Sequence, residues 1–141
     1  MVQKGRFIAV DYGAKRCGLA VSDALGMIAS PIEGVDRKGL DAALERLLTE
    51  EPCAGVVVGQ AVRLDGSMSA IESEIQPWLT QFAKRWPAIP VFREDERYSS
   101  QQAVQSMVQS GASKSARANK LKVDSVAAAL ILRAFLENIG R

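Results

Sequence analysis

The chain contains no histidine. This absence excludes a Ser-His-Asp triad, a Cys-His nucleophile pair and every histidine-ligated zinc site. The two cysteines, Cys17 and Cys53, are too few for a disulfide framework or a four-thiolate zinc site. We expect them to be small buried thiols in a reducing compartment. If the protein is an enzyme, its chemistry must come from carboxylates, lysine, hydroxyl groups or a metal ion held by oxygen.

Aromatic residues and long apolar runs are also scarce. Aromatic side chains make up 6% of the 141 residues, which argues against a platform on which bases stack. Arg6 and Asp11 leave no room for the apolar stretch of a signal peptide. The uncharged run from Ser125 to Leu132 is far too short to span a bilayer. We therefore expect a cytoplasmic protein with no membrane partner.

The remaining composition is typical of a soluble globular protein, with 48% apolar and 24% charged residues. The length predicts one domain over residues 1–141, large enough to bury a core without a structural metal. The net charge is only +2, so any affinity for nucleic acid must come from a local basic patch.

The order of the predicted elements indicates an α/β fold. Three strands come first, and strands then alternate with helices, which predicts a mixed five-stranded sheet with helices on both faces. Ser69 and Glu72 have the spacing of a capping box at a helix start. The predicted strands cover 7–10, 17–22, 28–35, 55–59 and 91–93, and the predicted helices cover 40–48, 69–86, 99–110 and 119–138.

Candidate functional carboxylates follow the predicted central strands. Asp11 ends the first strand, and Glu96 follows the last one within the cluster Asp95-Glu96-Arg97. In such sheets ligands bind beyond the carboxyl ends of the central strands, so both side chains are expected at one edge. By pattern alone, Asp11 could also be a turn residue, and the Glu96 cluster could be a solvated turn.

Asp124 has a helical spacing that places it on an apolar face. It shares that face with Ala128, Ile131, Leu132 and Phe135, which must pack on the sheet. A carboxylate that faces a core needs a partner or takes up a proton. Asp124 is therefore either a paired structural residue that favours the helix dipole, or a metal ligand beside the strand ends.

Three carboxylates without histidine suit Mg²⁺ or Mn²⁺, which prefer oxygen ligands. Asp11, Glu96 and Asp124 are the candidate metal ligands and catalytic residues. Two such ions about 4 Å apart can activate water for phosphodiester hydrolysis. Because like charges repel, we expect the metal-free Asp124→Asn protein to be at least as stable as the wild type.

Basic residues surround the candidate carboxylates. Clustered bases favour a polyanion, because they release counterions from phosphates, although a solvated loop has the same pattern. No motif that reads bases is present, so backbone or shape recognition is expected. The candidate nucleic-acid-binding residues are Lys15, Arg16, Arg97, Lys114, Arg117, Lys120 and Lys122.

Taken together, four motifs resemble the YqgF family, also called RuvX-like, over nearly the whole chain. The resemblance implies an RNase H-like fold, metal-dependent endonuclease activity at Asp11, Glu96 and Asp124, and a role in maturing the 5′ end of small-subunit rRNA. One departure from the pattern is Gln60-Ala61, where the family usually has Leu-Pro. The motifs are Ala9-Val10-Asp11-Tyr12-Gly13 with Lys15-Arg16 and Gly18, Val57-Val58-Gly59 leading to Asp65-Gly66-Ser67, Asp95-Glu96-Arg97-Tyr98-Ser99-Ser100, and Lys122-Val123-Asp124-Ser125.

The leading hypothesis is an endonuclease that uses Mg²⁺ or Mn²⁺ on structured nucleic acid, with precursor 16S rRNA as its substrate. The alternatives are a Holliday junction resolvase acting on branched DNA and a non-catalytic nucleic-acid-binding module of ribosome or transcription complexes. A phosphotransferase is disfavoured because one short domain has no second nucleotide-binding lobe. The sequence leaves monomer and dimer open.

Overall fold

A computed structural model describes residues 4–60, 65, 69–95 and 120–140, with the side chains of residues 120 and 121 excepted. The predicted helix over 99–110 lies outside these ranges. The described elements agree in type and order with the other predictions from the sequence. They are β1 (Arg6–Tyr12), β2 (Arg16–Ser22), β3 (Ala29–Asp36), the short 3₁₀ helix η1 (Arg37–Gly39), α1 (Leu40–Glu50), β4 (Cys53–Gln60), α2 (Glu72–Arg85), β5 (Val91–Asp95) and α5 (Lys120–Asn138).

The described strands form one mixed sheet in the order β3-β2-β1-β4-β5. β1 is antiparallel to β2 and parallel to β4, while β2 is antiparallel to β3 and β4 is parallel to β5. The apolar run from Phe7 to Val10 is at most 4% exposed. The structure therefore confirms the prediction of a central strand that is buried on both faces.

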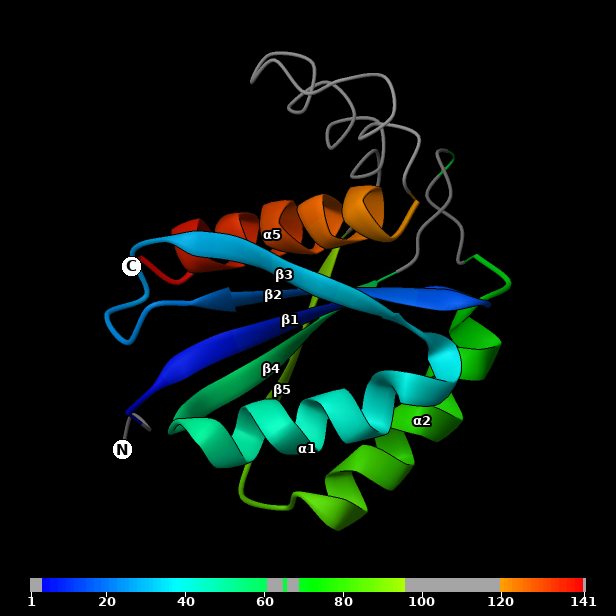
Figure 1. The fold of residues 1–141 in the computed structure, drawn as a ribbon, viewed down its shortest axis with the longest axis horizontal. Helices are drawn as coiled ribbons and strands as arrows, with labels where there is room; N and C mark the ends of the chain where they lie inside the picture. The colour runs from blue at the N-terminus through cyan, green and yellow to red at the C-terminus, as the bar shows by residue number, and fades with distance from the viewer. Residues whose placement is uncertain (1–3, 61–64, 66–68, 96–119, 141) are drawn as a thin grey trace.

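Helices cover both faces of the sheet (Figure 1). α1 and α2 pack on one face, where their side chains join a core that includes Ile8 and Val10. α5 packs on the other face, in a second core that includes Phe7 and Ala9. Since side chains alternate along a strand, Asp11 belongs to the face that α5 covers.

α5 has the apolar face that the sequence predicts. Ala128, Ile131, Leu132 and Phe135 are each at most 6% exposed and lie in the core beneath the helix. None of the helices in the described ranges has the length and apolar character that a membrane span requires.

The predicted capping box at the start of α2 is wrong. The helix begins at Glu72, and no side chain caps it; the backbone N–H of Glu72 donates to the Ser69 carbonyl. The Glu72 carboxylate is instead buried and accepts a hydrogen bond of 2.5 Å from Arg93. Arg93 also donates to the carbonyls of Val58 and Gly59. Through Arg93, Glu72 thus links α2 to β4 and β5. A local sequence pattern cannot reveal such a contact between distant elements.

Candidate functional site

Two of the three predicted metal ligands line one pocket. Asp11, on β1, and Asp124, in the first turns of α5, face a hollow of about 390 Å³. The other wall is the turn between β1 and β2, with Lys15 and Arg16. Glu96 lies outside the described residues, directly after the end of β5 in the sequence. The pocket therefore joins two carboxylates and a basic turn at the edge of the sheet that the sequence predicts.

The Asp124 carboxylate has a cationic partner. Its Oδ2 atom lies 2.6 Å from Nε of Arg16, and the two side chains are 18% and 36% exposed. Both atoms are shielded from solvent. This pair meets the requirement that a carboxylate on an apolar helix face have a partner. The positive charge of Arg16 also offsets the repulsion between the carboxylates. That repulsion was the reason to expect a metal-free Asp124→Asn protein at least as stable as the wild type.

Gly18 explains how α5 comes so close to the sheet. Gly18 pairs with Asp11 across the β1–β2 ladder. A Cβ atom at Gly18 would collide with the backbone carbonyl of Asp124. The next residue of the helix, Ser125, accepts a hydrogen bond of 3.5 Å from the backbone N–H of Leu19. The missing side chain at Gly18 therefore lets Asp124 lie over the strand next to Asp11.

Contacts from other elements hold the basic turn in place. The backbone N–H of Gly13 donates to the Arg16 carbonyl at 3.1 Å, and that of Arg37 donates to the Lys15 carbonyl at 2.9 Å. The Arg37 guanidinium also donates to Glu74 of α2 at 2.7 Å. These contacts leave Lys15 exposed at the rim and direct Arg16 toward the pocket.

Cys17 lies on the face of β2 that is turned away from α5, in the core that α1 and α2 cover. Burial, together with the negative charges of Asp11 and Asp124, raises the pKa of its thiol to about 11. Cys17 and Cys53 are both free and buried. A thiol with such a raised pKa is protonated at neutral pH, so it packs as a small apolar group and is a poor nucleophile.

The donor set of the pocket suits a hard divalent cation. Asp11 and Asp124 offer carboxylate oxygens from two different elements, which is the chemistry that Mg²⁺ and Mn²⁺ prefer. Within the described part of the chain, no group of three potential metal ligands comes together. Glu96, the third predicted ligand, lies outside that part of the chain.

The remaining predicted nucleic-acid-binding residues are only partly described. Lys122 is exposed on α5, and Lys120 begins this helix but has no described side chain. Arg97, Lys114 and Arg117 lie outside the described residues.

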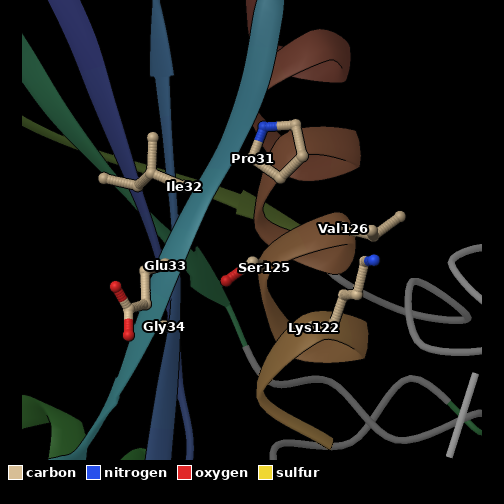
Figure 2. Close-up of a pocket in the computed structure, with 7 residues that line it drawn as sticks. All are labelled: Pro31, Ile32, Glu33, Gly34, Lys122, Ser125 and Val126. Carbon is tan, nitrogen blue, oxygen red and sulfur yellow. The ribbon is translucent and has the colours of Figure 1, made fainter. Parts of the chain in front are cut away.

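A second hollow, of about 370 Å³, lies beside the site between β3 and α5 (Figure 2). Pro31 and Val126 line it together with Lys122 and Ser125. Consecutive residues of α5 line the two hollows, Asp124 the first and Ser125 the second.

Solved structures include one of similar fold. A chain in the structure titled "T. thermophilus RuvC in complex with Holliday junction substrate" matches with a TM-score of 0.56 over 96% of each chain, at 18% sequence identity. The fold is thus RNase H-like, as the resemblance in the sequence implies.

The sequence itself defines the family. Residues 5–138 match the family described as "RuvX: Holliday junction resolvase". Proteins named "Putative pre-16S rRNA nuclease" are 42% identical in Christiangramia forsetii, over 93% of this chain and 97% of the relative, and 39% identical in Chlorobium chlorochromatii, over 94% of each. A third, from Bacteroides thetaiotaomicron, is 35% identical over 94% of this chain and 96% of its own length. The chain belongs to the RuvX family.

Sequence reasoning missed two contacts that shape the site. The pair between Arg16 and Asp124 joins residues more than a hundred positions apart, and no local pattern links them. Gly18 carried a usable indication, because a glycine inside a strand often marks the close approach of another backbone.

Proposed function

We propose that the protein is a metal-dependent endonuclease that hydrolyses phosphodiester bonds in structured nucleic acid. One observation carries the proposal. Asp11 and Asp124, from a central strand and a helix, meet in a pocket whose rim bears Lys15, in a chain of the RuvX family. A pocket with carboxylates inside and a base at its rim suits a cation that in turn faces a phosphate.

Asp11, Glu96 and Asp124 would hold the cation, Mg²⁺ or Mn²⁺. When bound, the cation would lower the pKa of a water molecule and stabilise the charge that develops on the leaving oxygen. Asp11 and Asp124 would fix the position of this chemistry, because β1 and α5 are packed together through a shared apolar core. Three carboxylates without an added cation would repel both one another and a phosphate.

The basic residues would bind the backbone of the substrate. Lys15, exposed at the rim, is placed to attract a phosphate toward the carboxylates. The groove beside Lys122 extends the surface along α5. Arg16, Arg97, Lys114, Arg117 and Lys120 complete the proposed set, which recognises charge and shape and does not read bases.

We propose precursor 16S rRNA as the substrate, with cleavage in the cytoplasm at the 5′ end of the mature RNA. The names of the relatives support this choice. A second candidate is a four-way DNA junction, which the family's description as a Holliday junction resolvase favours.

A comparative cleavage assay tests the proposal. The protein is incubated with a precursor 16S rRNA fragment and with a four-way DNA junction, in Mg²⁺, Mn²⁺, Ca²⁺ or excess chelator. We expect cleavage of the RNA in Mg²⁺ or Mn²⁺, little in Ca²⁺, and none with chelator. Preferred cleavage of the four-way DNA junction would show that branched DNA, and not precursor 16S rRNA, is the substrate. Binding without cleavage in any cation, or full cleavage in chelator, would overturn the proposed activity.

A further inference from the structure

We propose that Arg16 is a positioning residue that competes with the divalent cation for the Asp124 carboxylate. Arg16 thereby sets the cation concentration at which the site fills. This inference rests on the proposed function, because it assumes that Asp124 is a metal ligand. It goes further by giving Arg16 a role that is separate from phosphate binding.

The contact between the two side chains is a close ion pair whose contacting atoms are less accessible to solvent than the side chains as a whole. Nε of Arg16 lies 2.6 Å from Oδ2 of Asp124, so the opposite charges are in direct contact. Both atoms are shielded from solvent, so the charges are poorly screened. A cation that binds the same carboxylate must displace the guanidinium or share the oxygens with it at close range.

The backbones on both sides of the pair are fixed. Arg16 begins β2, and its carbonyl accepts a hydrogen bond from Gly13. The Asp124 backbone lies against Gly18, and the next residue, Ser125, accepts a hydrogen bond from Leu19 that holds the start of α5 on β2. When a cation binds the Asp124 carboxylate, the Arg16 and Asp124 side chains must therefore rearrange while their backbones stay in place.

The geometry also links this competition to substrate. An arginine fork matches the oxygens of a phosphate, and its charge persists at all physiological pH values. While Arg16 contacts Asp124, part of its guanidinium is engaged. When the carboxylate turns to a cation, the fork becomes available to an anion at the same pocket. Cation binding and phosphate binding should therefore strengthen each other.

The test measures Mn²⁺ binding without nucleic acid, by electron paramagnetic resonance of the free ion. It compares the wild type with Arg16→Gln and with Lys15→Gln, which removes the same charge from the neighbouring exposed residue. We expect Arg16→Gln to bind Mn²⁺ about tenfold more tightly than the wild type, and Lys15→Gln less than about threefold more tightly. In an Asp124→Asn background, Arg16→Gln should have no larger effect than Lys15→Gln.

Two results would overturn the inference alone. Either Arg16→Gln binds Mn²⁺ no more tightly than Lys15→Gln, or it binds more weakly than the wild type, which would make Arg16 a support for the ligand geometry. If neither the wild type nor any variant binds Mn²⁺ at millimolar concentration, the metal site of the proposed function fails as well.

A second measurement uses the unmodified protein and does not depend on the folding of a variant. The Nε–H signal of Arg16 is followed by NMR during a Mg²⁺ titration and is assigned by its loss in Arg16→Lys. We expect it to shift with the midpoint of cation binding, while the signal of Arg37, which contacts Glu74, stays in place. An Arg16 signal that does not change at saturating Mg²⁺ would contradict the competition.

Discussion

Gly18 of β2 and Asp124 of α5 are in direct contact: the backbone carbonyl of Asp124 occupies the space that a side chain at position 18 would need. Because Gly18 also pairs with Asp11 across the ladder, this contact brings a carboxylate of the helix beside a carboxylate of the central strand. The site depends on a strand position that carries no side chain.

Gly18→Ala should therefore damage both the fold and the site. The added methyl group forces α5 away from β2, and we expect a loss of about 3 kcal/mol in the free energy of unfolding. Gly39→Ala is the matched control, since a Cβ there meets its nearest atom at 3.4 Å, and should cost less than about 1 kcal/mol. Urea denaturation measures both. If Gly18→Ala loses no more free energy of unfolding than Gly39→Ala, α5 can move away from β2 at no cost, which would contradict this account.

Asp124→Asn should make the metal-free protein less stable than the wild type, contrary to the expectation from the sequence. The change removes one charge of the pair with Arg16, and we expect a loss of about 1 kcal/mol, because both side chains are partly exposed. Urea denaturation in chelator measures the loss, with Glu137→Gln on the exposed side of α5 as control. A metal-free Asp124→Asn protein that is as stable as the wild type would show that repulsion between the carboxylates outweighs the pair with Arg16.

The raised pKa of Cys17 predicts a loss of stability at high pH. The folded state holds the thiol pKa at about 11, above the ordinary value of 9.0, so it favours the protonated form. The stabilisation is complete below pH 9 and disappears as the pH rises through 11. At about pH 10.5 the wild type should have lost about 2 kcal/mol more than Cys17→Ala, relative to about pH 7.5. If the free energies of unfolding of the wild type and Cys17→Ala fall in parallel with rising pH, the thiol of Cys17 does not have a raised pKa in the folded state.

The basic residues before and at the start of α5 should contribute a salt-dependent part of nucleic-acid binding. Replacing Lys114, Arg117 and Lys120 together by alanine should weaken binding to all sequences alike. The slope of log affinity against log salt should fall by roughly 0.7 to 0.9 for each phosphate that the variant no longer binds. Filter binding at several salt concentrations measures this. The control replaces three exposed bases from η1, α1 and α2, on the side of the sheet opposite α5: Lys38, Arg46 and Lys84. Equal slopes for the two triple variants would show that the predicted track is a solvated segment.

The sequence predicts the architecture because the elements follow local rules. The apolar run before Asp11 gives a buried strand, and the spacing from Asp124 to Phe135 gives the buried face of α5. These patterns also place Asp11 and Asp124 correctly, since strand ends and helix faces have fixed geometry.

The contacts between distant segments could not be predicted in the same way. Glu72 has the spacing of a capping residue, but its carboxylate contacts Arg93 on another element. Arg16 looks in the sequence like one more base beside Lys15, although it pairs with Asp124. In each case, tertiary packing decides which of several possible partners a charged side chain finds.

The most direct test of the central claim is to separate cleavage from binding. Asp11→Asn and Glu96→Gln each remove a proposed metal ligand and leave the basic surface intact, while Glu137→Gln removes an exposed carboxylate of α5. Cleavage and affinity are measured for all three on the same precursor rRNA in Mn²⁺. We predict that Asp11→Asn and Glu96→Gln abolish cleavage and bind nearly as well as the wild type, and that Glu137→Gln cleaves and binds as the wild type does. Wild-type cleavage by Asp11→Asn or Glu96→Gln, or a loss of binding that matches the loss of cleavage, would contradict a metal-dependent nuclease at this site.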